Sequence, residues 1–210
     1  MDPSFWLQAW RENRTAFHRP DVNPHLAAHL DELALGPGDR VFLPLCGKTL
    51  DIGWLLARGF AVAGAEISPL AIEQLFQALG VEPQVAELGP VTRCAAPGLD
   101  VFVGDVFDVS RETLGPVDAT FDRAALVALP ADMRARYATH VAEITGGAPQ
   151  LLVTFEYEPS VMEGPPFSVP ADEVRALYGE RYDARMLAAG PVREGVLADR
   201  DIREVVWLLR

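Results

Sequence analysis

The segment from Arg40 to Ser68 constrains the fold more strongly than any other part of this chain. It starts with a short apolar run, Val41 to Leu45, which is typical of a strand buried on both faces. A turn with one glycine follows, and the spacing of apolar residues then predicts a helix over residues 50–58. Residues 60–65 form a second apolar run, with Glu66 directly after it. This order predicts a βαβ unit of the kind that binds nucleosides.

The spacing inside this unit indicates which nucleoside ligand would fit. Glu66 follows Gly47 by 19 residues, about the distance along the chain at which a carboxylate meets a ribose diol. The turn lacks the further glycines that would let the backbone approach a pyrophosphate, so a dinucleotide fits poorly. An adenosine ligand without phosphates, namely S-adenosylmethionine, is compatible with the turn. The alternative is a βαβ unit that binds nothing and keeps Gly47 for a tight turn.

The rest of the chain extends this unit into an α/β domain. Residues 81–97 show a mixed pattern in which no strand is assigned. Further strands are expected at residues 99–103, 118–121, 151–155, 183–187 and 205–209. Helices are expected near the N-terminus and at residues 24–33, 69–79, 131–144 and 171–178. These elements predict a three-layer, doubly wound, mostly parallel seven-stranded sheet with an antiparallel edge. We expect one domain over residues 1–210, with residues 1–38 as an N-terminal helical cover.

Composition excludes several classes of partner. The net charge of −12 opposes binding to nucleic acid or to an anionic membrane, which both require a cationic face. No apolar run approaches the roughly 20 residues of a membrane span, and the first residues do not resemble a signal peptide. The two cysteines are isolated and lack metal-binding spacing. We therefore expect a cytoplasmic monomer.

Three local patterns each have two interpretations. Phe5, Trp6 and Trp10 form either an aromatic stripe packed on the core or a flap that closes over a ligand. His25 and His29, four residues apart, are either surface histidines or half of a metal site; no further ligands accompany them, so we expect no metal. An acid after the strand at 99–103 either lies beside an adenine ring or caps the next turn.

Several motifs, taken together, resemble the thiopurine S-methyltransferase family, especially its bacterial branch. The matching segments are Phe5-Trp6, Trp10, Phe17-His18, the PLCGK turn at residues 44–48, GAEIS at 64–68, DRAAL at 122–126 and GPPFSVP at 164–170. The resemblance implies a Rossmann-like class I methyltransferase fold and S-adenosyl-L-methionine as methyl donor, with S-adenosyl-L-homocysteine as product. It also implies a small aromatic or heterocyclic thiol as acceptor. Bacterial relatives are associated with methylation of selenium and tellurium species as well.

The resemblance also implies which residues form the site. The positions that match cofactor contacts are Trp10, Leu45, Glu66, Arg123 and, on the adenine side, Val106. Phe17 and Arg123 match positions near the acceptor. Arg123 has a second interpretation, a structural ion pair with a neighbouring acid.

No residue is assigned as catalytic, because a thiol ionises near neutral pH and its thiolate is a good nucleophile. The site then needs mainly alignment and exclusion of water. If a base proves necessary, the candidates are His18, Asp122 and Glu156. The alternatives are methylation of selenium, tellurium or another soft small anion, and a sensor that binds S-adenosylmethionine without turnover. The missing glycines disfavour a nicotinamide oxidoreductase.

Overall fold

Helices cover both faces of a single mixed sheet in the computed structural model, which describes residues 3–193, 195 and 197–210. The strands are β1 (Arg40–Pro44), β2 (Ala61–Glu66), β3 (Gln84–Leu88), β4 (Val91–Ala96), β5 (Leu99–Val103), β6 (Ala119–Arg123), β7 (Gln150–Glu156), β8 (Ala184–Pro191) and β9 (Arg203–Leu209). The α-helices are α1 (Pro3–Arg11), α2 (Pro24–His29), α3 (Leu50–Ala57), α4 (Pro69–Leu79), α5 (Arg111–Leu114), α6 (Ala131–Ile144) and α7 (Ala171–Tyr178). Short 3-10 helices are η1 (Leu30–Leu33), η2 (Val106–Asp108) and η3 (Leu126–Ala128).

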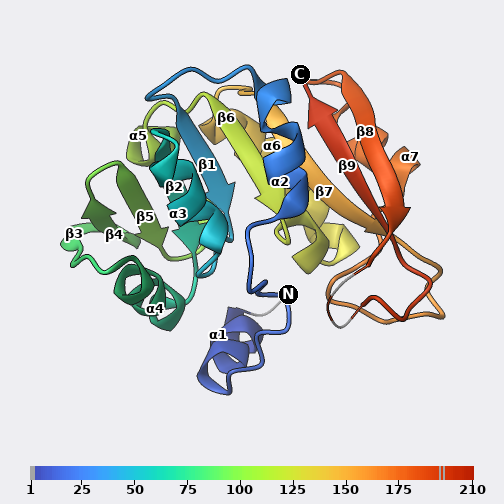
Figure 1. Cartoon of the computed structure of the whole chain (residues 1–210), viewed down its shortest axis with the longest axis horizontal. Helices are drawn as coiled ribbons and strands as arrows, with labels where there is room; N and C mark the ends of the chain where they lie inside the picture. The colour runs from blue at the N-terminus through green and yellow to red at the C-terminus, as the bar shows by residue number, and fades with distance from the viewer. Residues whose placement is uncertain (1–2, 194, 196) are drawn as a thin grey trace.

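The sheet has the strand order β3-β4-β5-β2-β1-β6-β7-β9-β8. The central strands β5, β2, β1, β6 and β7 run parallel. The carboxyl ends of these strands therefore lie on the same side of the sheet, and Figure 1 shows α1 beneath the ends of β1 and β6. In open α/β sheets, ligands bind outside the carboxyl ends of the strands, at the point where the strand order reverses.

The described residues form nine strands, and the expectation of seven was wrong in number. The two missed strands are β3 and β4, a hairpin within the segment that showed a mixed pattern. Every residue of β3 is exposed, so burial imposes no apolar alternation on it. With this hairpin, the sheet is antiparallel at both edges. The outer strands are β3-β4-β5 at one edge and β7-β9-β8 at the other. The predicted antiparallel hairpin at the C-terminal edge is confirmed.

Local signals explain where the helices begin and end. The Ser68 side chain accepts a hydrogen bond from the Ala71 backbone N–H, and Pro69 occupies the first helical position of α4. Gly80 ends α4 with a φ of 69°, a left-handed conformation that glycine adopts without a steric cost. Asn23 and Thr49 cap α2 and α3 in the same way.

Two apolar layers fill the space between the sheet and its helices. Successive residues of β1 point to opposite faces, so Val41 and Leu43 join one layer and Phe42 joins the other. The first layer packs against α2, η1, α3 and α4, and the second packs against α5, α6 and α7. The predicted three-layer, doubly wound architecture is confirmed.

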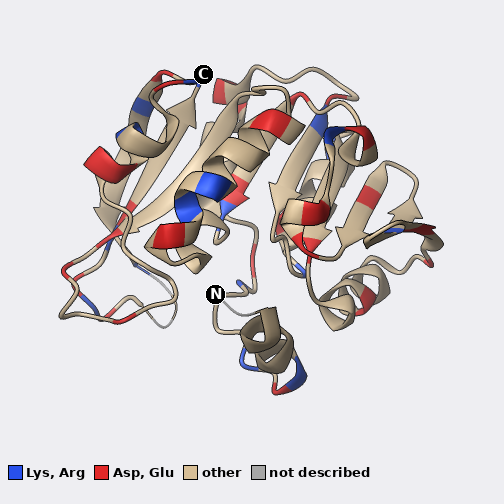
Figure 2. Cartoon of the chain, turned by 180° about the vertical axis from the view of Figure 1, so that it is seen from behind, with Lys and Arg blue, Asp and Glu red and all other residues tan. Residues whose placement is uncertain are grey.

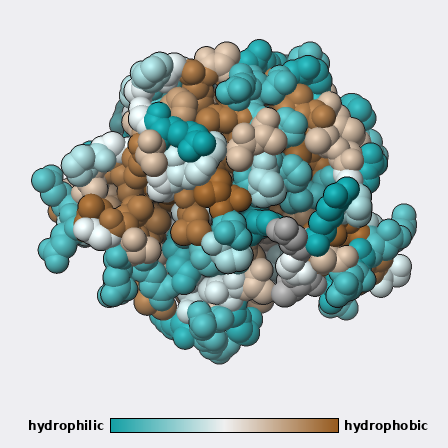
Figure 3. Space-filling view, viewed as in Figure 1, coloured by the Kyte–Doolittle hydropathy of each residue, from teal (hydrophilic) through white to brown (hydrophobic). Residues whose placement is uncertain are grey.

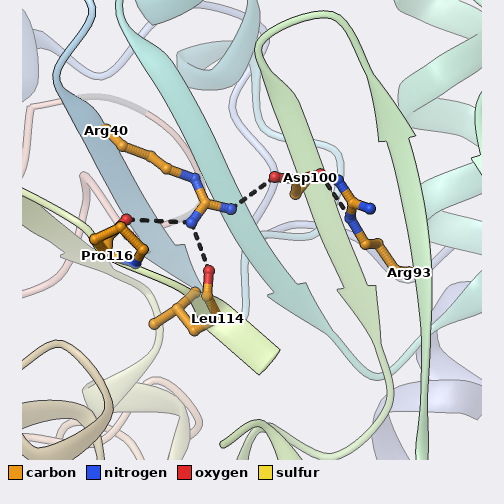
Figure 4. A network of polar contacts seen from close by, with 5 residues as sticks. All are labelled: Arg40, Arg93, Asp100, Leu114 and Pro116. Carbon is orange, nitrogen blue, oxygen red and sulfur yellow. Dashed lines mark hydrogen bonds and ion pairs between the residues drawn. The ribbon is translucent and has the colours of Figure 1, made fainter. Parts of the chain in front are cut away.

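A polar network links strands at the amino ends of β1 and β5, away from the carboxyl ends of the strands, where α1 lies. Asp100 accepts hydrogen bonds from the guanidinium groups of Arg40, at 2.7 Å, and Arg93, at 2.5 and 2.8 Å (Figure 4). Arg40 also donates to the carbonyl oxygens of Leu114 and Pro116. Because β2 separates β1 from β5, this network links strands that are not adjacent.

Acidic positions occur along most of the helices visible from behind and do not gather in one patch (Figure 2). No helix within the described part of the chain combines the length and the apolar character that a membrane crossing requires.

Candidate active site

The turn after β1 forms the floor of the candidate site. Leu45 has a φ of 48° and Gly47 has a φ of 53°. A positive φ at a residue as bulky as leucine is costly and persists where the surroundings hold it, commonly at functional sites. The Cys46 N–H donates to the Ala65 carbonyl oxygen at 3.0 Å, which fastens the turn to the end of β2.

Glu66 completes this floor from the carboxyl end of β2. One carboxylate oxygen accepts the Gly47 N–H at 2.9 Å, and the other accepts the Ser68 N–H at 2.8 Å. The side chain is buried, and burial raises the pKa of Glu66 above its ordinary value while the backbone N–H groups of Ser68, Gly47 and Ile67 oppose that rise. With these N–H groups bound, the carboxylate keeps a lone pair that can accept a hydrogen bond from a ligand.

Aromatic side chains from the N-terminal segment lie over the floor. The ring of Phe17 packs edge-to-face against Trp6 at 5.5 Å and against Trp10 at 5.4 Å between centroids. A Cβ placed on Gly47 would lie 3.0 Å from the Trp10 ring, so glycine permits this close approach. The Lys48 ammonium lies 5.8 Å from the centroid of the Trp10 ring and donates a hydrogen bond to Gln74.

We expect residues 5–17 to exchange amide hydrogens more slowly when S-adenosylhomocysteine is added. Trp10 is 4% exposed but Phe5 is 37% exposed, so the outer turn of α1 has little packing to protect it without a ligand. Hydrogen exchange followed by mass spectrometry measures the change, with peptides from the core strand β9 as the internal control. Equal exchange with and without ligand would favour the permanently packed stripe over the closing flap.

Arg123 enters the site from the end of β6. Its guanidinium donates a hydrogen bond of 2.8 Å to the Phe17 carbonyl oxygen, which links β6 to the N-terminal segment. Burial lowers the pKa of Arg123, while the carboxylates of Asp51 and Glu204 oppose that change. Among the described residues, Arg123 makes no side-chain ion pair within 4.0 Å. Its observed partner is therefore a backbone carbonyl, which leaves its positive charge facing the site.

Two carboxylates hold the segment that connects this aromatic cover to α2. Asp51 of α3 accepts the Asn23 N–H at 2.7 Å and the Thr49 hydroxyl at 2.8 Å. Glu204 of β9 lies 2.8 Å from the Nε2 of His25. Both contacts lie on the C-terminal side of Phe17. They hold the chain in place where it enters α2, whereas α1 lies on the N-terminal side of Phe17 and is not held by them.

These elements enclose a cavity of about 640 Å³, a volume typical of small-molecule sites. One wall is apolar and includes Val127, Phe155, Met162, Pro165 and Pro166. The basic side chains that line it are Arg14, Arg19, Lys48, Arg123 and Arg200, and the acidic ones are Asp51, Glu66 and Glu204. A chain with a net charge of −12 thus lines this cavity with more basic than acidic side chains.

Five of the six predicted site residues line this cavity: Trp10, Phe17, Leu45, Glu66 and Arg123. Val106 does not; it is 7% exposed, packs in the core, and its carbonyl accepts a hydrogen bond from His140. Asp105 caps η2 by accepting the Phe107 N–H at 3.0 Å. The capping interpretation of this acid therefore has a direct contact, and a role of Val106 toward adenine stays a prediction.

The three candidate bases lie in different places. His18 lines the cavity, and burial followed by the charges of Lys48 and Arg123 lowers its pKa, so the imidazole is neutral at pH 7. Asp122 is fully buried and Glu156 lies 3.3 Å from Arg203, and neither lines the cavity. Only His18 has the position that proton removal from a bound acceptor requires.

Sequence reasoning missed two carboxylates of the site, Asp51 and Glu204. Asp51 lies in the first turn of α3, where an acid is ordinary helix chemistry and carries no separate signal. Glu204 comes to the cavity through the pairing of β9 with β7, which a single strand pattern does not reveal. The wall at Pro165 and Pro166 did have a signal, the GPPFSVP segment.

No group of three or more histidine, cysteine, aspartate or glutamate side chains in the described residues is arranged to hold a metal ion. His25 and His29 stack with ring centroids 6.4 Å apart, and His25 pairs with Glu204.

A second groove of about 500 Å³ lies between α4 and the strands β4 and β5. Hydrophobic residues gather over this part of the surface, on the left of Figure 3. It includes Ile72, Phe76, Val81, Cys94 and Val103, and shares no residue with the first cavity.

Comparison with known families matches nearly the whole chain to one family. The family model described as thiopurine S-methyltransferase (TPMT) matches residues 1–200. A protein of that name from Xanthobacter autotrophicus is 53% identical over 210 residues, covering 100% of this chain and 99% of the relative. One from Acinetobacter baylyi is 43% identical over 213 residues, covering 100% and 98%.

Solved structures with low sequence identity share the fold. A TehB-like SAM-dependent methyltransferase from Corynebacterium glutamicum has a TM-score of 0.58 at 14% identity, covering 99% of this chain and 98% of that one. The 1,6-didemethyltoxoflavin-N1-methyltransferase of Burkholderia thailandensis, solved with bound S-adenosylhomocysteine, has a TM-score of 0.64 at 15% identity, covering 99% and 86%. These likenesses agree with the layer order and the mostly parallel sheet.

Proposed function

The chain belongs to the thiopurine S-methyltransferase family, and on that premise we propose that it transfers a methyl group from S-adenosylmethionine to the sulfur of a small aromatic or heterocyclic thiol. The observation that carries the proposal is the shared cavity. Glu66, from the end of β2, and Arg123, from the end of β6, both line it. A carboxylate for ribose hydroxyls and a cation for an anionic sulfur therefore face one enclosed space.

The residues of the floor fit the adenosine part of the ligand. Glu66 keeps a lone pair for a ribose hydroxyl group, and the turn at Gly47 brings backbone close to the same carboxylate. Trp10 closes this end with an apolar ring and excludes water. When bound, S-adenosylmethionine supplies a methyl group on a positively charged sulfonium.

Apolar residues of the cavity lining support an aromatic acceptor. The wall that includes Val127, Phe155 and Pro166 offers apolar surface to a flat ring. Arg123 supplies a cation with delocalised charge, which favours the ionised form of a thiol. The Phe17 carbonyl oxygen accepts a hydrogen bond from Arg123, and Phe17 lines the same cavity from the N-terminal segment. We propose that these residues align the thiolate and keep water out, and that no residue removes a proton.

The acceptor, and not the enzyme, should therefore control the pH dependence of the chemical step. For two aromatic thiols whose pKa values differ by about 2 units, we expect rate-against-pH midpoints that differ by a similar amount. Arg123 lowers both midpoints relative to the free thiols by favouring the anions. The measurement is the single-turnover rate between pH 5 and 10 for each thiol.

A common midpoint for both thiols would contradict alignment without a base. Because the pKa of His18 is lowered from its ordinary 6.5, catalysis by His18 would place that shared midpoint below 6.5. His18→Gln is the matched variant, since it removes a titrating ring and keeps polar atoms. We expect it to leave the separation between the two midpoints unchanged.

The remaining features of this proposal are a monomer that works in the cytoplasm without bound metal, nucleic acid or membrane, and an N-terminal cover formed by residues 1–38 on one domain. Methylation of selenium or tellurium species, and binding of S-adenosylmethionine without turnover, are the competing activities. Arg123 would favour a selenolate as well as a thiolate, so its charge does not distinguish the two acceptors. Measuring the methylation rates of a thiol and a selenol in competition does.

A further inference from the structure

Asp122 is a buried carboxylate that the proposed chemistry does not use. It lies on β6, is fully buried, and faces the layer between the sheet and α6. Burying an ionised carboxylate is unfavourable unless hydrogen bonds compensate for the loss of water. Its neighbour in sequence, Arg123, lines the cavity. One pair of residues therefore joins the core to the site.

The contacts of Asp122 organise the turn that follows β6. One oxygen accepts the Leu126 N–H at 3.1 Å, and the Ala125 N–H also bonds the carboxylate. The other oxygen accepts the Tyr137 hydroxyl at 2.7 Å. Tyr137 is itself fully buried on α6. The carboxylate thus fastens the turn to the helix behind it.

The turn held in this way is strained. Ala124 has a φ of 65°, in the left-handed region that favours glycine. Such a conformation persists when its surroundings determine it more strongly than local preference does. The N–H groups that Asp122 binds belong to the two residues directly after Ala124. On the other side of Ala124, Arg123 donates to the Phe17 carbonyl and holds the aromatic cover.

We propose that Asp122, backed by Tyr137, is a positioning residue that aims Arg123 into the cavity and makes ligand affinity depend on its own ionisation. This inference rests on the proposed function only for the identity of the ligand. Tyr137 donates a hydrogen bond to Asp122, and Asp122 holds the strained turn. This turn sets the direction of Arg123, which binds the Phe17 carbonyl oxygen.

The ionisation falls in an accessible pH range. Burial raises the pKa of Asp122 from 3.8 to about 6, and the hydrogen bonds from Tyr137, Leu126 and Ala125 oppose that rise. The titratable groups that face it are Tyr137 of α6 and Tyr178 of α7. Burial raises the pKa of both phenols well above 10, so both stay neutral. Protonation of Asp122 therefore weakens its hold on the turn as the pH falls through about 6.

The contribution of Asp122 to folding stability changes with pH in the opposite direction from its hold on the turn. This difference separates a positioning role from a purely structural one. Because the folded-state pKa of Asp122 is raised, the folded protein binds the proton more tightly than the unfolded chain does between about 3.8 and about 6. The contribution of Asp122 to stability therefore falls as the pH rises through that window. Asp122→Asn removes this unfavourable ionisation and keeps one acceptor oxygen. We expect its melting temperature at pH 7.5 to equal or exceed that of the parent protein.

The test compares Asp122→Asn and Tyr137→Phe with a matched control, Tyr178→Phe. Tyr178 is equally buried and near the same carboxylate, but its hydroxyl has no hydrogen-bond partner among the described residues. Titration calorimetry measures the dissociation constant of S-adenosylhomocysteine from about pH 5 to about pH 9.5, a range wide enough to contain the raised midpoint. Hydrogen exchange of residues 123–128 without ligand measures the turn itself, as protection corrected for intrinsic rates.

Tyr137→Phe should raise the midpoint of both pH profiles by about 1 to 2 pH units, the effect of removing one hydrogen bond to a charged group. Tyr178→Phe should leave the midpoints in place, and Asp122→Asn should bind about tenfold more weakly at pH 7.5 with no midpoint near 6. Glu66 lines the cavity and burial also raises its pKa, so the shift between variants is diagnostic and the parent profile alone is not.

Equal midpoints for the parent, Tyr137→Phe and Tyr178→Phe would overturn the inference, as would full affinity in Asp122→Asn. If the parent protein does not bind S-adenosylhomocysteine, the proposed function fails, and exchange without ligand still decides this inference. A protection midpoint at residues 123–128 that moves only in Tyr137→Phe supports positioning, whereas pH-independent protection contradicts it.

Discussion

Replacing Glu66 by alanine should weaken the binding of S-adenosylhomocysteine by about 10- to 150-fold, because a lost hydrogen bond to a charged group corresponds to roughly 1.5–3 kcal/mol. The buried carboxylate lines the cavity at the end of β2. It also accepts the backbone N–H groups of Gly47 and Ser68. The variant therefore loses both the ligand contact and part of the support of the floor. Titration calorimetry at pH 7.5 measures the change.

Glu87→Ala is the matched control for this prediction. Glu87 is an exposed acid on β3, far in the sheet order from β1, and its replacement changes the net charge by the same amount. We expect its dissociation constant to equal that of the parent protein. A folded Glu66→Ala variant with unchanged affinity would exclude Glu66 as the ribose contact, and thermal melting of each variant verifies folding.

Replacing Arg123 by alanine should lower kcat/KM for a thiol by about 10²- to 10³-fold, the usual effect of removing one preorganised group that stabilises developing or existing charge. Arg123 faces the cavity from β6 and binds the Phe17 carbonyl at 2.8 Å. Its loss removes the cation for the thiolate and the link to the aromatic cover together. Steady-state kinetics with a fixed thiol at pH 7.5 measures the decrease.

Arg136→Ala provides the control for Arg123. Arg136 is an exposed residue of α6 that stacks 3.9 Å from the Phe107 ring centroid and does not line the cavity. It should retain kcat/KM within about twofold. Arg123→Lys keeps the charge but replaces the planar fork, so it should fall between the parent and alanine variants. If Arg123→Ala retained activity like that of Arg136→Ala, the thiolate would have to be held by another cation.

The sequence predicts the central part of this fold well because burial leaves a pattern there. The strands of the central parallel sheet are apolar on both faces, and caps such as Ser68-Pro69 mark where helices begin. The hairpin β3-β4 lacks that pattern because β3 is exposed along its whole length. Its pairing depends on the neighbouring strand β5, which is a tertiary effect.

The same distinction explains the site. Glu66 is predictable because its spacing from Gly47 follows from one βαβ unit. Glu204 is distant in sequence from Glu66 and Arg123 and reaches the cavity because β9 pairs with β7. Asp122 appeared to be a candidate base from sequence alone, whereas the structure places it behind the cavity wall, bonded to Tyr137. The turn that it binds includes Ala124 in a left-handed conformation, which the sequence does not indicate.

Transfer of a labelled methyl group to sulfur is the reaction that decides whether this protein is an S-methyltransferase. The protein is incubated with S-adenosylmethionine that carries a trideuterated methyl group and with an aromatic thiol, and mass spectrometry identifies the labelled product. We expect a trideuteromethyl thioether, formed together with one equivalent of S-adenosylhomocysteine and absent without protein. Tight binding of the donor with no labelled product from any thiol in a panel, or a label attached to nitrogen, would contradict it.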